Sequence, residues 1–236
     1  SQHHRLRFLL EEHVTIKGLL FDFDGLILDT ETPEYDLWCK IFQEFSQSLP
    51  LELWARAVGA SLDAFHPAAY LLTLTGREIN ISEVEQRHRA ASLEIILQSA
   101  PIPGVTDFLE HGRQSRIKMA VASSSDRAWV GGHLDRLGLT AYFDTICTRE
   151  DVAQVKPNPA LYLTACQRLG LQPAETVVFE DSPNGITAGV AAGCHVVAVP
   201  NALTRHLDTS HAHWVVPSLQ EVTLEKLNQR FNGHSK

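Results

Sequence analysis

The C-terminal two-thirds of the chain alternates short apolar runs with segments of helical periodicity. An earlier apolar run, Leu19 to Phe21, reads as a strand buried on both faces, which is typical of a parallel sheet. Further strands are expected at residues 117–122, 145–148, 176–179 and 195–199, and helices at 128–137, 159–170 and 185–192. This alternation predicts an α/β protein with a doubly wound, Rossmann-like parallel sheet and right-handed crossovers.

The pattern changes between residues 29 and 103, where no strand is expected. Thr32-Pro33-Glu34 predicts a helix start, with a cap, a proline in the first turn and an acid that favours the dipole. Ser82-x-x-Glu85 is a capping box that predicts a second helix. We therefore expect a core domain at 15–28 and 104–236, with an inserted α-helical cap domain at 29–103.

Composition narrows the functional class. The 236 residues carry a net charge of −8 with no block of Lys or Arg, which argues against nucleic acid and anionic membranes as partners. No apolar run approaches the roughly 20 residues that span a bilayer. The segment before Thr15 looks like an extension ahead of the first domain. Its apolar run, Phe8 to Leu10, is too short for a signal peptide, so none is expected.

The four cysteines are scattered and form no CxxC pair, which disfavours a zinc site. They are expected to be buried thiols in a reducing cytosol, so we expect a cytoplasmic protein. They are Cys39, Cys147, Cys166 and Cys194.

Two aspartates directly after the first strand, Asp22 and Asp24, carry the strongest chemical signal. Carboxylates are not tolerated inside an apolar core unless they are paired or bind a metal. The carboxyl ends of parallel strands, however, are where α/β proteins place their sites. Residues i and i+2 of a strand point to the same side, so both carboxylates are expected at one site.

Three more polar islands follow strands or lie in loops: Ser123-Ser124-Ser125, Lys156-Pro157-x-Pro159 and Glu180-Asp181-Ser182. Each alone has an ordinary explanation as a turn, a surface lysine or a helix cap. Together they assemble one site. Carboxylates from two strand ends suit Mg²⁺, and serine hydroxyl and backbone N–H groups can bind the oxygens of a transferring phosphoryl group. Lysine adds a compact positive charge, and a second aspartate can protonate a leaving oxygen.

The four islands in this order resemble the haloacid dehalogenase superfamily, and the helical insert resembles its β-phosphoglucomutase-like branch of phosphatases and mutases. The resemblance covers about Lys17 to Val216. It implies that Asp22 is a nucleophile that becomes a phosphoaspartate and that Asp24 is the general acid and base. Further implied roles are phosphoryl binding by Ser123, the Ser124 backbone and Lys156, and Mg²⁺ binding by Asp22, the Asp24 carbonyl, Asp181 and Glu180, the last directly or in the outer sphere.

Positions where this chain departs from the family pattern bear on which reaction it catalyses. Asp24 favours phosphoryl transfer over carbon–halogen cleavage, because the dehalogenases lack this acid. The sugar-phosphate mutases carry a histidine where this chain has Glu34 and an arginine where it has Leu62. A mutase must clamp a second phosphate, which an arginine does well. Arg56 or Arg77 are possible substitutes.

The sequence thus predicts a Mg²⁺-dependent phosphatase acting on a small phosphorylated metabolite such as a sugar phosphate or nucleotide. A sugar-phosphate mutase and a non-catalytic metal- or phosphate-binding module are the alternatives. A dinucleotide-binding protein is disfavoured, since no G-x-G-x-x-G follows the first strand. Substrate and oligomeric state stay open.

Three further groups of residues carry weaker signals. His66 and Arg56 are candidates for substrate contact, whereas Trp38 and Trp54 are expected in a core rather than as a substrate platform. A solvated loop is expected for His206, His211 and His213, instead of a second metal site.

Overall fold

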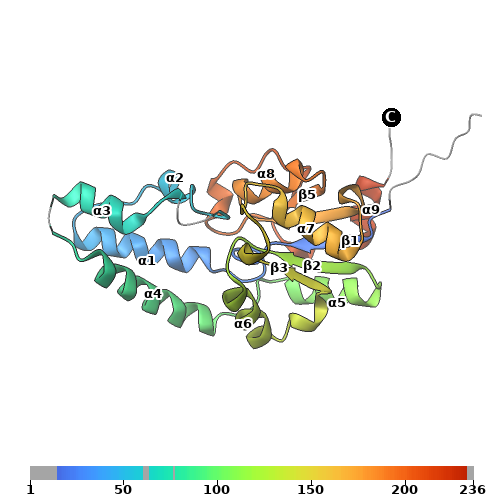
Figure 1. Cartoon of the computed structure of the whole chain (residues 1–236), viewed down its shortest axis with the longest axis horizontal. Coiled ribbons are helices and arrows are strands. Elements are labelled where there is room, and N and C mark those ends of the chain that lie inside the picture. Colours follow the sequence, from blue (N-terminus) through green and yellow to red (C-terminus); the bar gives the residue numbers. More distant parts are fainter. Residues whose placement is uncertain (1–14, 61–63, 77, 233–236) are drawn as a thin grey trace, which may run out of the picture.

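The computed structural model describes residues 15–60, 64–76 and 78–232. Its centre is a parallel sheet of six strands in the order β3-β2-β1-β4-β5-β6 (Figure 1). The strands are β1 (Gly18–Phe21), β2 (Lys118–Ala122), β3 (Thr145–Cys147), β4 (Thr176–Glu180), β5 (His195–Ala198) and β6 (Trp214–Val215). The predicted doubly wound α/β fold is confirmed, and its first five strands lie where the apolar runs placed them.

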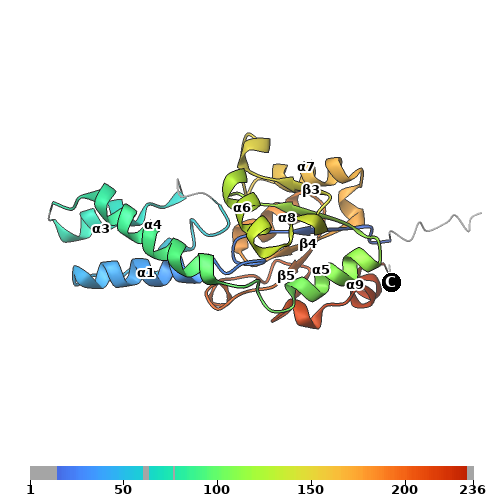
Figure 2. The ribbon, with the colours of Figure 1, turned by 90° about the horizontal axis from the view of Figure 1, so that it is seen from below.

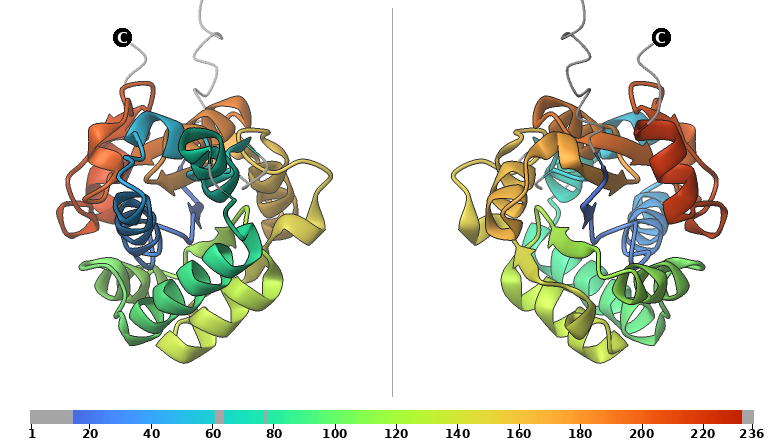
Figure 3. Two further views of the ribbon diagram at one scale, coloured as in Figure 1. Left: turned by 90° about the vertical axis from the view of Figure 1, so that its left-hand side faces the viewer. Right: turned by 90° about the vertical axis from the view of Figure 1, so that its right-hand side faces the viewer.

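Alternate residues of each central strand face opposite layers. Leu19 and Phe21 of β1 belong to one apolar cluster, whereas Leu20 belongs to another. The first cluster is covered by α5 (Val105–Gln114), α6 (Arg127–Leu137) and α9 (Leu224–Phe231), and the second by α7 (Ala160–Leu169) and α8 (Pro183–Ala191). Figure 3 shows α5 and α9 on one side of the sheet and α7 on the other. Burial on both faces explains why the strands read as unbroken apolar runs.

Two predicted helix ends are fixed by glycine. Gly138 ends α6 at φ 70° and Gly170 ends α7 at φ 67°, the left-handed conformation that glycine adopts without steric cost. The sequence reading missed α5, although Val105, Phe108, Leu109 and Gly112 repeat at helical spacing and are buried. It also missed α9 and the two-residue edge strand β6, which is too short to leave a pattern.

The segment between β1 and α5 is helical, as expected. It contains α1 (Glu31–Glu44), α2 (Leu51–Trp54), α3 (Pro67–Thr75) and α4 (Ile81–Gln98). These helices extend away from the sheet (Figures 1 and 2) and enclose their own apolar cluster, with α1 packed on α4. We propose that residues 29–103 form the cap domain.

Both predicted helix starts in this segment need correction by two residues. The residue before α1 is Thr30 rather than Thr32, and α4 is capped by Asn80, whose side chain accepts a hydrogen bond from the Glu83 N–H, rather than by Ser82. Asparagine and serine are both good caps, and at α4 it is Asn80 that has the extended backbone and makes the bond.

Among the described residues, no helix is long and apolar enough to cross a membrane. The expected extension before Thr15 lies outside the described residues.

One glycine inside α6 and one at its C-terminal end provide a matched test of stability. An added Cβ meets no atom within 4 Å at either Gly132, exposed in the helix interior, or Gly138. Gly132→Ala should stabilise the protein by about 0.5–1 kcal/mol through helix propensity. Gly138→Ala should destabilise it by about 1 kcal/mol, because the left-handed backbone strains an L side chain. Urea unfolding measures the free energy of unfolding of both variants. A change of the same sign in both would contradict the assignment of the helix end.

Candidate active site

Three carboxylates meet at the carboxyl ends of two neighbouring strands. Asp22 follows β1, Glu180 ends β4, and Asp181 follows it. The register pairs Phe21 with Phe179, and the Asp22 N–H donates to the Phe179 carbonyl at 3.1 Å. The chain winds from β1 to β2 and β3 on one side and to β4, β5 and β6 on the other, so the carboxylates lie at the topological switch point. One ligand atom from each of the three lies within 4.8 Å of the others.

A buried lysine links two of these carboxylates. The Nζ of Lys156 lies 2.8 Å from Asp22 Oδ1 and 2.6 Å from Glu180 Oε1. The Tyr162 hydroxyl donates to the same Glu180 oxygen, and the Tyr162 ring lies against the ammonium. Burial alone would lower the pKa of Lys156, but attraction by Asp22 and Glu180 outweighs it and raises the pKa. Lys156 is therefore a permanent positive charge in the cluster, not the ordinary surface lysine of the alternative explanation.

The carboxylate oxygens that face away from Lys156 suit a divalent cation. Asp22 Oδ2 and Asp181 Oδ1 are buried and have no hydrogen-bond partner among the described residues. An ionised oxygen without a partner is costly to bury, and hard oxygen donors of this kind are those that Mg²⁺ prefers. Asp22 and Asp181 could therefore hold a metal ion, whereas Glu180 Oε1 already accepts hydrogen bonds from Lys156 and Tyr162. A direct or outer role for Glu180 stays a prediction.

Asp181 is oriented by a residue that the sequence reading took only for a strand stop. The Asn201 Nδ2 donates to Asp181 Oδ2 and to the Gly25 carbonyl, both at 3.0 Å. The Asn201 Oδ1 accepts from the backbone N–H groups of Leu203 and Thr204. This leaves Asp181 Oδ1 as the oxygen facing the cluster. Asn201 lies after β5, and only the fold brings it beside the loop after β1.

Crowding raises the proton affinity of these acids. Burial, followed by repulsion from Glu180, raises the pKa of Asp22 to about 7 despite Lys156. Burial, followed by repulsion from Asp22, raises the pKa of Asp181 well above its ordinary value. The cluster thus carries more negative charge than Lys156 balances, which is the electrostatic condition for binding a cation.

Asp24 lies beside the cluster with its side chain in a separate hydrogen-bond network. Its Oδ1 accepts from Thr30 Oγ1 and Trp129 Nε1, each at 2.8 Å. Its Oδ2 accepts from Ser125 Oγ at 2.5 Å and lies 3.5 Å from Ser123 Oγ. Burial raises the pKa of Asp24, whereas the hydrogen bonds from Ser125 and Trp129 lower it. The side chain of Asp24 is not among the cluster of potential metal ligands, so its predicted metal contact would have to come from its backbone carbonyl.

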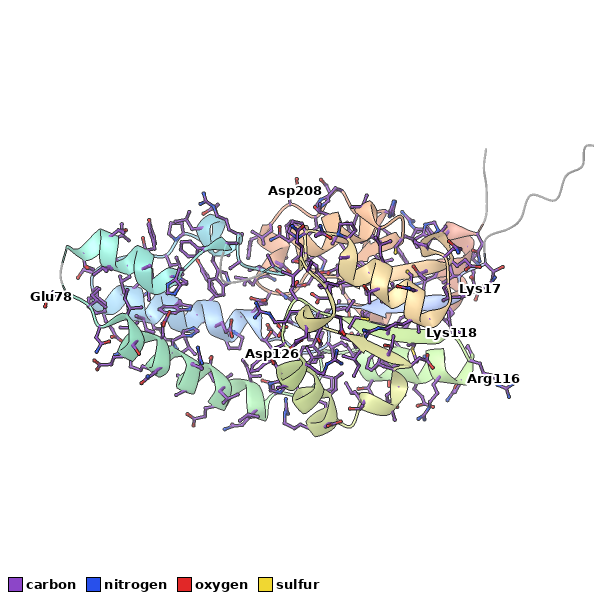
Figure 4. The ribbon with its side chains drawn as sticks, in the orientation of Figure 1. Lys17, Glu78, Arg116, Lys118, Asp126 and Asp208 are labelled. Atoms are coloured by element: carbon purple, nitrogen blue, oxygen red, sulfur yellow. The ribbon has the colours of Figure 1, made fainter. Side chains whose placement is uncertain are left out.

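The serine island contacts both Asp24 and the cap segment. Ser123 is fully buried and its Oγ accepts from the Ser125 N–H at 3.1 Å. Ser124 Oγ instead donates to the Gly59 carbonyl at 3.1 Å. Asn184 Nδ2 donates to the neighbouring Val58 carbonyl at 2.9 Å, so the loop 58–59 lies on the core beside the site. Figure 4 shows this arrangement of the two parts, with Asp126 near their junction and Glu78 at the distant tip.

The helical segment also contributes two acids. Glu31 and Glu34, on the first turn of α1, are half-buried. Burial raises the pKa of Glu31 well above its ordinary value, and repulsion from Glu34 and Asp24 adds to this. Burial, followed by repulsion from Asp24, raises the pKa of Glu34 to about 7. From the sequence, Glu34 was noted as an acid at a helix start and as the residue in place of a mutase histidine, and Glu31 was not singled out.

The remaining candidates lie outside this centre. Arg56 is exposed. His66 caps α3 through its Nδ1, and its Nε2 lies 2.9 Å from Glu85 Oε1. Trp38 and Trp54 are buried in the apolar cluster of the helical segment, which confirms the core interpretation. Leu62 and Arg77 lie outside the described residues.

Among the residues that the structure describes, the C-terminal histidines are not part of a potential metal site. Within the described part of the chain, Asp22, Glu180 and Asp181 are the group that could hold a metal ion, and His206, His211 and His213 are not part of one. The four cysteines are free thiols, three of them buried and Cys39 half-buried.

Comparisons with known proteins agree with the geometry. Residues 19–199 match the family model described as haloacid dehalogenase-like hydrolase. The chain is 41% identical over 220 residues to "Putative phosphatase YhcW" of Bacillus subtilis (strain 168), which covers 93% of this chain and 100% of that protein. It is 32% identical over 185 residues to fructose-1-phosphate phosphatase YqaB of Escherichia coli (strain K12), covering 77% of this chain and 95% of that protein.

A solved structure shares the fold. The β-phosphoglucomutase of Clostridium difficile superimposes with a TM-score of 0.72 at 22% identity, covering 92% of this chain and 98% of that one. The mixed fold of parallel sheet and inserted helices is thus common to a mutase and to this chain.

The raised pKa of Asp22 predicts the pH dependence of stability in EDTA. A carboxyl group whose folded pKa exceeds its unfolded value stabilises the fold at low pH, and this contribution is lost as pH rises from about 4 towards about 7. The free energy of unfolding should therefore fall across this window, and less steeply in Asp22→Asn. Asp208→Asn is the control, because Ser210 lowers the pKa of this exposed carboxyl, so its effect lies below the window. Equal slopes for wild type and Asp22→Asn would contradict the crowding of charge described above.

Proposed function

The chain belongs to the haloacid dehalogenase-like hydrolases and is a phosphatase-type enzyme; on this premise we propose that it is a Mg²⁺-dependent phosphatase of small phosphorylated metabolites that works through a phosphoaspartate. The observation that carries the proposal is the buried group Asp22–Lys156–Glu180 with Asp181 beside it. A paired nucleophile, a fixed positive charge and oxygens without partners have a use in phosphoryl transfer that a structural ion pair lacks.

The first step is proposed to be attack by Asp22. Its carboxylate forms a bond to phosphorus while the bond from phosphorus to the leaving oxygen breaks, and Asp24 supplies the proton that this oxygen needs. Lys156, Ser123 and the backbone N–H of Ser124 bind the phosphoryl oxygens. Mg²⁺ bound by Asp22 and Asp181 would screen the repulsion between carboxylate and phosphate.

The second step is hydrolysis of the phosphoaspartate. Asp24, now ionised, takes a proton from a water molecule that attacks phosphorus, and the bond to Asp22 breaks. Inorganic phosphate leaves and Asp22 is regenerated.

A phosphatase is favoured over a mutase by the residues near Asp24. Glu31 and Glu34 stand on the first turn of α1, and a carboxyl group cannot clamp the second phosphate of a bisphosphate intermediate as an arginine would. Arg56 is exposed, so it makes a weak clamp for such a group. Analysis of products decides between the two: a phosphatase releases inorganic phosphate, whereas a mutase moves the phosphate on the sugar. A binding module would have no use for Asp24.

The substrate class rests on a relative. The Escherichia coli protein is named for fructose 1-phosphate, so we propose sugar phosphates as the first panel, followed by nucleotides. We also propose a cytoplasmic location, which the four free thiols support.

Asp22→Asn should abolish turnover while the fold survives. The amide cannot attack phosphorus, and it removes one charge from a crowded group, so the apo protein should be at least as stable as wild type. Phosphate release on the sugar-phosphate panel is measured beside thermal unfolding. A folded Asp22→Asn protein with wild-type rates would sink the mechanism.

Mg²⁺ should raise both activity and melting temperature, and Asp181→Ala should remove both effects. A ligand that binds only the folded state stabilises it by about 2.7 kcal/mol at 100 times its Kd. Calorimetric titration with Mg²⁺ and melting curves with and without EDTA measure this. Asp208→Ala, an exposed aspartate, is the control and should keep the wild-type response. Full activity after EDTA treatment would refute the metal assignment.

A further inference from the structure

The two oxygens of Asp24 have chemically different partners. Oδ1 receives the Trp129 indole N–H and the Thr30 hydroxyl, whereas Oδ2 faces the hydroxyls of Ser125 and Ser123. An indole N–H can only donate, whereas a hydroxyl can either donate or accept. Oδ1 is therefore held as an acceptor by Trp129, and Oδ2 is the oxygen whose partners tolerate a proton on it.

Trp129 is itself fixed in three ways. It lies on the first turn of α6, where its backbone N–H donates to Asp126 Oδ1 at 2.8 Å. Its ring meets the His133 ring edge to face at 4.3 Å between centroids. The half-buried indole also packs on the apolar cluster beneath α6. A donor locked by packing positions its acceptor more sharply than a flexible side chain does.

We propose that Trp129 is a positioning residue for Asp24: its indole N–H holds Oδ1, so that Oδ2, on the side of Ser123, is the oxygen that exchanges a proton with the leaving group and with water. This inference rests on the proposed function. It assigns a role to a residue outside the four islands of the sequence. Trp129 lies shortly after the serine island, but its contact with Asp24 is visible only in the fold.

The test is Trp129→Phe, which keeps an aromatic ring near His133 and removes the indole N–H together with part of the indole volume. Trp54→Phe is the matched control, because its buried Nε1 has no partner among the described residues. Both variants and wild type are assayed with Mg²⁺ on the best sugar phosphate and on p-nitrophenyl phosphate, whose leaving group needs little protonation. Mg²⁺ affinity is measured by calorimetry.

For Trp129→Phe we expect kcat on the sugar phosphate to fall roughly tenfold or more, since a hydrogen bond to a charged group is lost. The fall on p-nitrophenyl phosphate should be clearly smaller, and KM and Mg²⁺ affinity should stay within about twofold, because a positioning role acts on proton transfer and not on binding. Trp54→Phe should change both substrates alike and little. A merely structural role of Trp129 would lower both rates together or weaken Mg²⁺ binding, and either result would overturn the inference.

A second readout does not depend on activity or on the folding of Trp129→Phe. In protein labelled with ¹⁵N-tryptophan, the Trp129 indole N–H signal is assigned by substituting the other three tryptophans. It should move upfield in Asp24→Ala, since its acceptor is gone; an unmoved signal would overturn the inference. If wild type is active and Trp129→Phe has the same rates, the proposed function stands and only the role of Trp129 is overturned. If wild type is inactive on every substrate, both the proposed function and the role of Trp129 are overturned.

Discussion

The ammonium of Lys156 between Asp22 and Glu180 is the interaction on which this site depends. Three buried carboxylates meet at two neighbouring strand ends, and buried charges of one sign are costly unless a cation lies among them. Lys156 supplies that charge at hydrogen-bond distance from two of them and is itself buried to 1% exposure. Such a buried pair adds little net stability, because the desolvation of both partners offsets their attraction. Its effect is to hold the proposed nucleophile, Asp22, and a positive charge in fixed positions.

Two glycines make room for the carboxylates. A Cβ at Gly185 would lie 1.9 Å from the carboxyl carbon of Glu180, and one at Gly25 would lie 2.3 Å from Asp181 Oδ2. Gly25 also has a φ of 79°, which an L side chain adopts only with strain. The first turn of α8 and the loop after β1 can therefore approach the carboxylates closely. Packing of the site is thus specified by the absence of side chains as much as by the charged groups.

The site is closed by elements from opposite ends of the chain. Ser124 and Asn184 of the core bind the carbonyls of Gly59 and Val58, while Leu203, after β5, packs into the apolar cluster of the helical segment. Two residues earlier, Asn201 holds Asp181. The loop after β5 therefore contacts both the cluster and the cap segment, so the position of that segment and the orientation of Asp181 share one support.

The sequence alone determined the sheet and the list of chemical groups. Apolar runs at β1, β2, β4 and β5 and the glycines after α6 and α7 are local signals, since burial on both faces and a left-handed helix end depend on a residue's own neighbours. The carboxylates after β1 and β4 and the island around Lys156 were identified by their order along the chain. Both helix starts in the inserted segment were displaced by two residues. At α4 the reason is that two neighbouring polar residues, Asn80 and Ser82, can each cap a helix, and Asn80 makes the bond.

Only the tertiary structure decided which oxygen faces which partner. Trp129 reaches Asp24, Asn201 reaches Asp181, and Glu31 and Glu34 stand beside the acid, through contacts between residues that are mostly distant along the chain. A hydrogen bond has a direction and a length that depend on how helices pack on the sheet, and no pattern of apolar and polar positions encodes these. The order of residues along the chain indicated the groups that we propose to react, whereas the fold determines their orientation and their partners.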